Sequence, residues 1–70
     1  MSLRGVLARN LRLQRARLGL SQEAFADLAG IDRTYISMLE RERSAASLDM
    51  IERLANALEI KPGRLLDGDE

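Results

Sequence analysis

The sequence predicts an all-α domain of five short helices, and three observations support this prediction. Apolar residues recur every three or four positions along most of the chain, which is the spacing of amphipathic helices. Ser, Asp, Gly and Pro interrupt that pattern at the short intervals expected of helix starts and ends. The chain has only 70 residues, 46% of them apolar and 31% charged. A chain of this length can bury only about 60% of its unfolded surface, so a partner subunit would add stability.

The first half of the chain predicts two helices. The first covers about residues 3–18 and is closed by Gly19, with an apolar stripe of Leu3, Val6, Leu7, Leu11 and Leu18. Ser21 is a suitable N-cap for the second helix, which ends at Gly30. Its apolar face is expected to comprise Phe25, Leu28 and Ala29.

Three further helices are predicted in the second half. Asp32 caps the third, which buries Ile36 and Leu39 and partly covers Tyr35. Ser47 caps the fourth, whose stripe is Leu48, Ile51, Leu54, Ala55 and Leu58. Pro62 starts a short fifth helix that runs through Leu66. Residues 1–66 therefore form one domain, and residues 67–70 form a short acidic tail that we expect to hang free.

The composition argues against several functional classes. The chain has neither Cys nor His, so it lacks the usual metal ligands and the commonest general base. No apolar run approaches the roughly 20 residues of a membrane span, and the first residues have no apolar leader. We therefore expect a cytoplasmic protein that is not an enzyme, with no metal, cofactor, membrane contact or small-molecule ligand.

The formal net charge is zero, but the charge is unevenly distributed. Residues 1–35 carry six arginines against three acids, whereas residues 36–70 carry five cations against eight acids. Ten of the eleven cations are Arg, the side chain that binds phosphate and guanine with two parallel hydrogen bonds. This asymmetry is a weak indication of an anionic partner.

The segment from Gln22 to Arg41 predicts a helix-turn-helix, in which two short helices are joined by a tight turn. Ala26 is expected where the two helices cross, because a larger side chain there would separate their axes. Gly30 is expected in a left-handed conformation, which costs other residues about 1–2 kcal/mol. Burial of the apolar face of the third helix leaves a polar face outward: Arg33, Thr34, Ser37 and Arg41.

These residues resemble the Cro/C1-type (XRE family) helix-turn-helix proteins. The resemblance rests on residues 18–23, Gly30-Ile31, residues 32–37, residues 39–41 and residues 51–58. It implies a compact lambda-repressor-like fold and a sequence-specific transcriptional regulator of double-stranded DNA. The segment Asp-Arg-Thr-Tyr-Ile-Ser at residues 32–37 is most similar to restriction–modification controller proteins, which are homodimers that bind palindromic operators.

The resemblance also implies roles for individual residues. Gln22 would donate to a DNA phosphate, and base edges would be contacted by Arg33, Thr34 and Ser37. Arg15 and Glu40 would form a partly buried ion pair. This sequence departs from the family at Glu42, where Gly is common, and at Ala45-Ala46, where Asn-Pro is common. We therefore expect the third helix to continue to about Arg43.

Each proposed DNA contact has a simpler structural alternative. Arg33 could be a solvated side chain beside Asp32, and Thr34 and Ser37 could be ordinary polar surface. The Tyr35 hydroxyl could meet a phosphate, or its ring could only pack between helices. Arg41 and Arg43 could contact DNA, or pair locally with the acids at positions 40 and 42. The remaining arginines of the first helix, Arg4, Arg9 and Arg12, are expected to be a solvated face.

Apolar residues near the C-terminus suggest a dimer. One small domain has limited capacity to bury Met50, Leu58, Ile60, Leu65 and Leu66, and pairing across a two-fold axis would cover them. Alternatively, Leu65 and Leu66 fold back on the first helix. An alternative function is a protein-interaction module such as an antitoxin. The few residues beyond the domain count against that alternative, because they are too few to wrap a partner.

Overall fold

Four α-helices and one turn of 3-10 helix, without any strand, make up residues 2–68, the part of the chain that the computed structural model describes. In chain order they are α1 (Leu3–Arg17), α2 (Gln22–Ala29), α3 (Arg33–Glu40), α4 (Leu48–Leu58) and the 3-10 turn η1 (Pro62–Leu65). The all-α prediction is confirmed, but the prediction of five helices is wrong. The fifth segment contains only four residues in helical conformation, too few for the hydrogen bonds of an α-helix.

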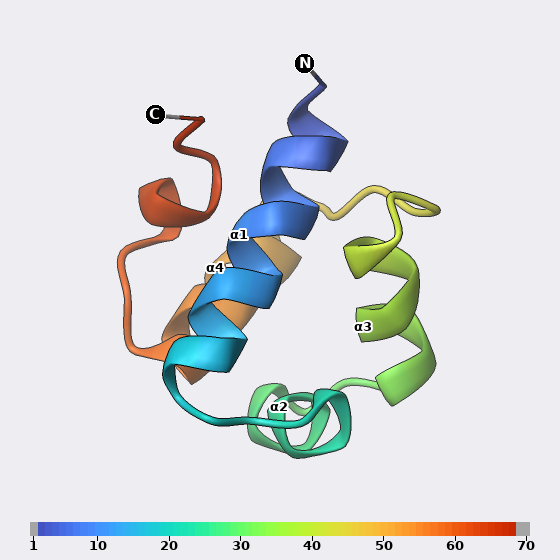
Figure 1. Ribbon diagram of the computed structural model, residues 1–70, viewed down its shortest axis with the longest axis vertical. Coiled ribbons are helices and arrows are strands. Elements are labelled where there is room, and N and C mark those ends of the chain that lie inside the picture. Colours follow the sequence, from blue (N-terminus) through green and yellow to red (C-terminus); the bar gives the residue numbers. More distant parts are fainter. Residues whose placement is uncertain (1, 69–70) are drawn as a thin grey trace.

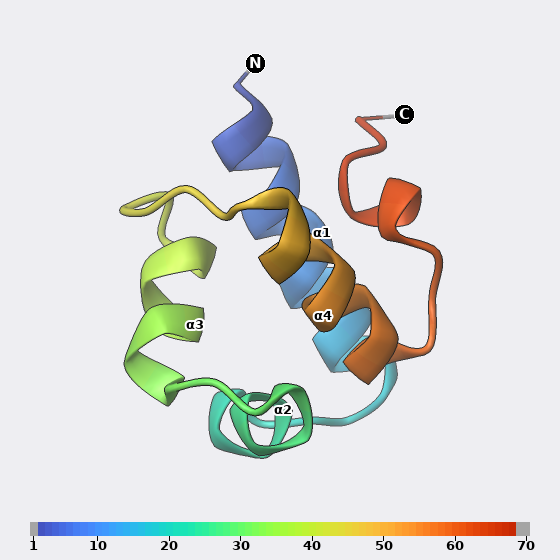
Figure 2. The ribbon, with the colours of Figure 1, turned by 180° about the vertical axis from the view of Figure 1, so that it is seen from behind.

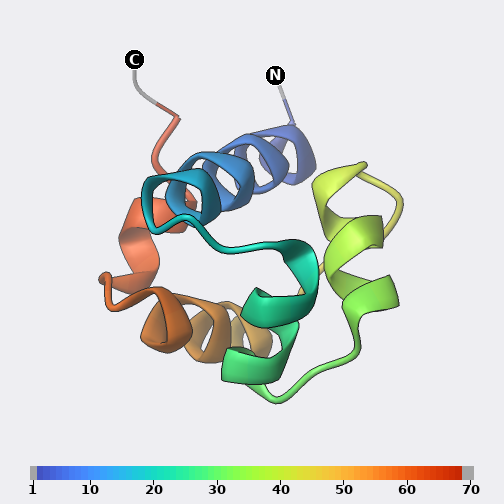
Figure 3. The ribbon, with the colours of Figure 1, turned by 60° about the horizontal axis from the view of Figure 1, so that its bottom comes forward.

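The helices pack around α1, which runs through the middle of the molecule with α3 on one side and η1 on the other (Figure 1). Helix α4 crosses α1 on its far side, as the view from behind shows (Figure 2). Helix α2 lies across the end of this pair, between α4 and α3 (Figure 3). The start of α1 and the segment after η1 both lie at the opposite end of the molecule (Figure 1).

Three helices begin with a serine cap. Ser2, Ser21 and Ser47 each accept a hydrogen bond on Oγ from the backbone N–H three residues later, at 3.0–3.1 Å. This confirms the caps predicted at Ser21 and Ser47. Asp32 occupies the N-cap position of α3 as predicted, but its side chain makes no capping hydrogen bond.

All four α-helices are followed by a residue with positive φ. Gly19 and Gly30 have φ of 70°, as their sequence positions predict. Glu42 and Glu59 adopt the same region, at 61° and 60°, although glutamate is disfavoured there. The turn at Glu42 closes with a 2.8 Å hydrogen bond from Arg43 N to Met38 O. Helix α3 therefore ends at Glu40, and the prediction that it continues to Arg43 is wrong.

The core is formed by apolar residues of every element, with Phe25, Leu11, Ile36, Leu39, Leu54, Leu58 and Leu65 buried completely. Four leucines assigned to apolar stripes are exposed instead: Leu3 and Leu48 by 67% and 80%, Leu18 and Leu28 by 41% and 61%. Each of the four lies in the first or last turn of its helix or at its C-cap. Helical spacing predicts which face of a helix an apolar residue occupies. It does not predict whether another helix covers that part of the face, and these four helix ends are left uncovered.

Candidate nucleic-acid interface

Helix α3 presents its polar face to solvent because its other face is anchored in the core. Ile36 and Leu39 are 0% and 1% exposed, and Ala26 of α2 is 2% exposed. Arg33 and Thr34 are exposed in the first turn of α3, and Ser37 is half-buried one turn later. The predicted division of α3 into a buried and a polar face is confirmed.

An ion pair between α1 and α3 fixes the position of α3. Arg15 Nε donates to Glu40 Oε2 at 2.8 Å, and Arg15 Nη2 donates to Glu40 Oε1 at 2.9 Å. The two parallel bonds match the planar guanidinium to the carboxylate, a geometry that sets direction as well as distance. The side chain of Glu40 is only 3% exposed. The ion pair expected from the resemblance is therefore present.

Other side chains complete this cluster, which we call the Glu40 anchor: Arg12, Arg15, Gln22 and Glu40. Gln22 Nε2 donates to Glu40 Oε1 at 3.1 Å, and Arg15 Nη1 donates to Leu20 O at 2.9 Å. Arg12 Nη1 donates to the backbone carbonyl of Glu40 at the end of α3. Arg12 was expected to be merely solvated, and that expectation is wrong. The anchor joins α1, α2 and α3 around one carboxylate.

Two opposing effects act on the pKa of Arg15 in the Glu40 anchor. The hydrogen bonds to Glu40 raise the pKa of Arg15, and burial offsets part of that increase. Within residues 2–68, no buried side-chain nitrogen or oxygen lacks a hydrogen-bond partner.

Gln22 lies at the first position of α2, where an anion would meet the positive end of the helix dipole. Its amide nitrogen carries two hydrogens, and Glu40 accepts only one of them. The second hydrogen is available at a half-buried site beside α3. This geometry is compatible with the phosphate contact that the family resemblance implies.

Tyr35 has a different hydrogen-bond partner. Its half-buried ring packs against the core, and its hydroxyl donates to the carbonyl of Ala45 at 3.1 Å. A phenol has one hydrogen to donate, so in this arrangement it has none for a phosphate. The geometry supports the packing alternative, in which Tyr35 holds the connector between α3 and α4.

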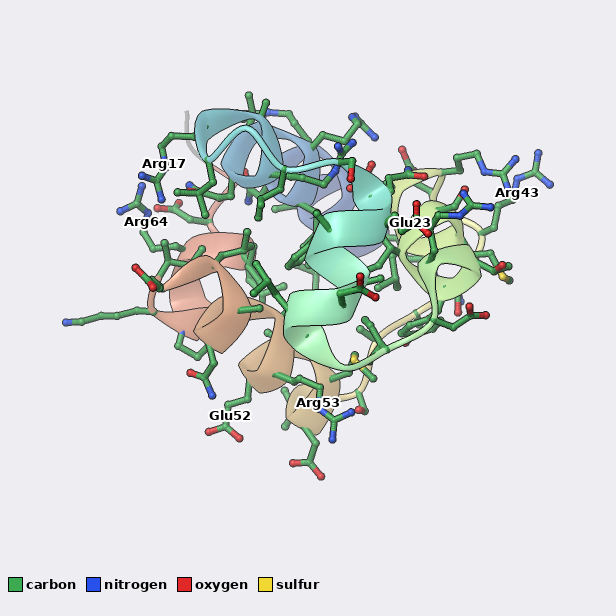
Figure 4. All side chains as sticks on the ribbon, turned by 90° about the horizontal axis from the view of Figure 1, so that it is seen from below. Arg17, Glu23, Arg43, Glu52, Arg53 and Arg64 are labelled. Carbon is green, nitrogen blue, oxygen red and sulfur yellow. The ribbon has the colours of Figure 1, made fainter. Side chains whose placement is uncertain are left out.

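Arg41 and Arg43 are both exposed beyond the end of α3, and Arg43 extends away from the molecule (Figure 4). The local ion pairs considered for them are not formed. The carboxylate of Glu40 is bound by Arg15 and Gln22 instead. The carboxylate of Glu42 lies over Gly5, where an added Cβ would approach its Oε1 to 3.3 Å. Glu42 thereby places a negative charge at the start of α1, which has no acidic residue in its own first turn.

Sequence reasoning missed a second buried polar residue, Asn10, which is 8% exposed. Its Nδ2 donates to Leu65 O at 2.9 Å and to Asp67 O at 3.1 Å. The signal was available, because Asn10 follows Val6 and Leu7 at helical spacing and so lies on the buried face. The tail was expected to hang free from residue 67, but Asn10 holds Asp67. The tail residues 69–70 lie outside the described residues.

The residues predicted for a dimer interface are not all available to a partner. Leu58 and Leu65 are 0% exposed within a single chain, so they cannot contact a second one and that assignment is wrong. The folding of η1 against α1 buries Leu65, as the alternative proposed. Met50, Ile60 and Leu66 are half-buried and pack against the core.

Two features are absent from residues 2–68. None of the helices there is both long and apolar enough to span a bilayer. No group of three or more acidic side chains in the same residues is placed to hold a metal ion.

The arrangement of α2, the turn at Gly30 and α3, with one polar face of α3 left open, defines a helix-turn-helix domain. The sequence profile of the helix-turn-helix family matches residues 11–65. This chain belongs to that family, and the resemblance drawn from its sequence is confirmed.

The chain is also similar to known proteins in sequence and in structure. The chain is 48% identical over 64 residues to a hypothetical transcription factor of Neisseria meningitidis serogroup B, covering 91% of this chain but only 60% of the relative. It is 38% identical over 66 residues to the control protein C.SmaI of Serratia marcescens, covering 94% and 79% of the two chains. The crystal structure of the Neisseria factor superposes with a TM-score of 0.92 at 47% identity, covering 94% of this chain and 76% of that one.

A restriction–modification controller has the same fold. The crystal structure of C.AhdI from Aeromonas hydrophila superposes with a TM-score of 0.85 at 42% identity, covering 89% of this chain and 94% of the controller. The specific likeness to controller proteins, suggested by residues 32–37, is thus found in both sequence and structure.

Proposed function

We propose that this chain is a cytoplasmic, sequence-specific transcriptional regulator that binds a palindromic DNA operator as a homodimer, in the control of a restriction–modification operon. The observation that carries the proposal is the open polar face of α3, with Arg33 and Thr34 exposed in its first turn. The Glu40 anchor holds that face in a set direction. Similarity to a hypothetical transcription factor and to controller proteins supports the regulatory role.

The proposed contacts are of two kinds, those to base edges and those to phosphates. Arg33 at the start of α3 would enter the major groove and bind guanine O6 and N7 with two hydrogen bonds, the commonest specific contact of its kind. Thr34 and Ser37 would contact neighbouring bases or phosphates. Gln22 would donate its free amide hydrogen to a phosphate and set the register of α3 on the duplex. Arg41 and Arg43 would add phosphate contacts beyond the helix.

The test begins with selection of duplexes from a random pool by the purified protein. We expect a two-fold symmetric site, and affinity that falls steeply with salt as phosphate contacts release counterions. Arg33→Ala should then weaken binding to that site by about 1–3 kcal/mol and relax the preference at one base pair in each half. Gln22→Ala should weaken binding to selected and random duplexes alike.

Arg53→Ala is the matched control, because Arg53 is also exposed but lies on α4, away from α3 (Figure 4). It removes the same charge and should leave the preference unchanged. Circular dichroism checks that each variant is folded. If folded Arg33→Ala selects the same sequence with unchanged affinity, α3 is not the reading element and the proposal fails.

A further inference from the structure

Two residues that face each other, Gly5 and Glu42, are each unfavourable in the backbone conformation that they adopt. Gly5 lies near the start of α1, and glycine is a poorer helix former than alanine. Glu42 follows α3 with φ of 61°, a left-handed conformation that is disfavoured for a residue with a Cβ. The start of α1 lies beside the end of α3 (Figure 3). Both unfavourable conformations therefore occur at a single contact between the two helices.

This contact requires the missing side chain of Gly5. A Cβ added to Gly5 would lie 3.3 Å from Glu42 Oε1 and 3.5 Å from Glu42 Cδ, so a longer side chain would take the place of the carboxylate. The carboxylate lies against the first turn of α1, which has no acidic residue of its own. The positive end of the helix dipole favours a negative charge there. Gly5 thus leaves room for the Glu42 carboxylate, and the helix start stabilises its charge.

If the Glu42 carboxylate left Gly5, its nearest cations along the chain would be Arg41 and Arg43. Both arginines are exposed, and Arg43 extends away from the molecule (Figure 4). Arg41 Nε donates to Ser37 O at 3.4 Å, so Arg41 lies along the outer side of α3. A released carboxylate can bind either guanidinium with two parallel hydrogen bonds. Because a phosphate uses the same donors, a guanidinium bound in this way would no longer be available to DNA.

We propose that Gly5 and Glu42 are positioning residues for the contacts of Arg41 and Arg43 with the DNA backbone. Gly5 keeps the Glu42 carboxylate at the start of α1, and both arginines stay available to phosphates. The inference rests on the proposed function, which assigns phosphate contacts to Arg41 and Arg43. It adds that a residue of α1, outside the helix-turn-helix, controls how strongly the chain binds the backbone without changing which bases it prefers.

The first test replaces Gly5 by leucine, a good helix former whose side chain would displace the carboxylate. In Gly5→Leu the released Glu42 competes with phosphates for Arg41 and Arg43. Affinity for the selected duplex and for random duplexes should fall together, by roughly three- to tenfold, because phosphate contacts carry no sequence information. The slope of log affinity against log salt concentration should decrease by about 1 for each arginine withdrawn.

The matched control is Gly63→Leu. Gly63 lies on η1, on the other side of α1 from α3 (Figure 1), and no atom would lie within 4 Å of a Cβ added to it. This variant makes the same substitution without displacing a charge, so its affinity and salt slope should equal those of wild type. Circular dichroism and urea denaturation check that each variant is folded.

A second substitution separates the charge of Glu42 from its shape. Glu42→Gln keeps the size of the side chain but cannot form an ion pair with arginine. Added to Gly5→Leu, it should restore most of the lost affinity. Made alone, it should change affinity little, because the wild-type carboxylate is already held away from the arginines. If Gly5→Leu does not fold, Gly5→Asp provides the same comparison, since it repels Glu42 by charge and places an acid where the dipole of α1 favours one.

Folded Gly5→Leu that binds both kinds of duplex like wild type overturns the proposal. A loss of affinity that Glu42→Gln does not restore also overturns it, because that loss would come from the position of the turn and not from the charge. Failure of the proposed function gives a different result: no preferred site is selected, while affinity for random duplexes still falls in Gly5→Leu and recovers with Glu42→Gln. A preferred site without that pattern would refute this inference alone.

Discussion

Two polar anchors hold α1 to the rest of the molecule, and they differ in charge and in what they hold. The Glu40 anchor is ionic and fastens α1 to the helix-turn-helix through two parallel bonds between Arg15 and Glu40. What we call the Asn10 anchor is neutral and fastens α1 to the backbone carbonyls of Leu65 and Asp67 through one amide group. The first sets the direction of the proposed reading helix, whereas the second only closes the C-terminal segment over the core.

The two anchors differ in how much desolvation they require. A buried ion pair requires desolvation of both partners and is strongly destabilising when only one partner is removed. A buried amide bound to carbonyls carries no net charge, so its removal costs less. The ion pair is located where it sets the direction of α3, the proposed reading helix.

The largest effect is expected at the ionic anchor. Glu40→Ala should lower the free energy of unfolding by about 2–4 kcal/mol, because it leaves Arg15 charged and partly buried without its partner. Urea denaturation followed by circular dichroism measures this loss. Removing Arg15 and Glu40 together should cost less than the two single changes added. Strictly additive losses would show that the pair contributes no coupling energy, and Glu52→Ala, on the exposed face of α4, should be nearly neutral.

A smaller effect is expected at the neutral anchor. Asn10→Ala should cost about 1–2 kcal/mol, because two hydrogen bonds are lost and two carbonyls lose their donor. Thermal and urea denaturation give the cost, and a DNA-binding assay supplies the contrast. At temperatures where the variant is folded, its affinity for the selected duplex should equal that of wild type. A change in base preference would contradict the division of roles between the two anchors.

The smallest changes in stability are expected at the helix ends beside the two anchors. Glu59 ends α4, ahead of the segment that Asn10 holds, and Glu59→Gly should stabilise the protein by about 0.5–1 kcal/mol by relieving its left-handed conformation. Glu42 ends α3 beside the ionic anchor, and its carboxylate also lies at the start of α1. Glu42→Gly should therefore stabilise less, or not at all. A larger gain at Glu42 in urea denaturation would show that its carboxylate contributes nothing.

Much of the candidate site could be predicted because its signals are local. Ile36 and Leu39 determine which face of α3 is buried, and that leaves Arg33 and Thr34 outward whatever the neighbours do. The pairing of Arg15 with Glu40 is different, because residues 25 apart in sequence have no local reason to meet. It was predicted only from the likeness to a known family.

Helical periodicity, serine caps and glycine stops are properties of short segments, so the chain alone was enough to locate α1 to α4 and the polar face of α3. It also predicted a fifth helix where only the 3-10 turn η1 forms. The lengths and partners of the helices depend on contacts between segments. The end of α3 at Glu40 depends on Glu42 adopting a left-handed conformation with its carboxylate over Gly5. The burial of Leu65 and the exposure of Leu48 depend on where η1 and α4 meet α1. Tertiary packing decided these features, because periodicity identifies an apolar face but not which part of that face another helix will cover.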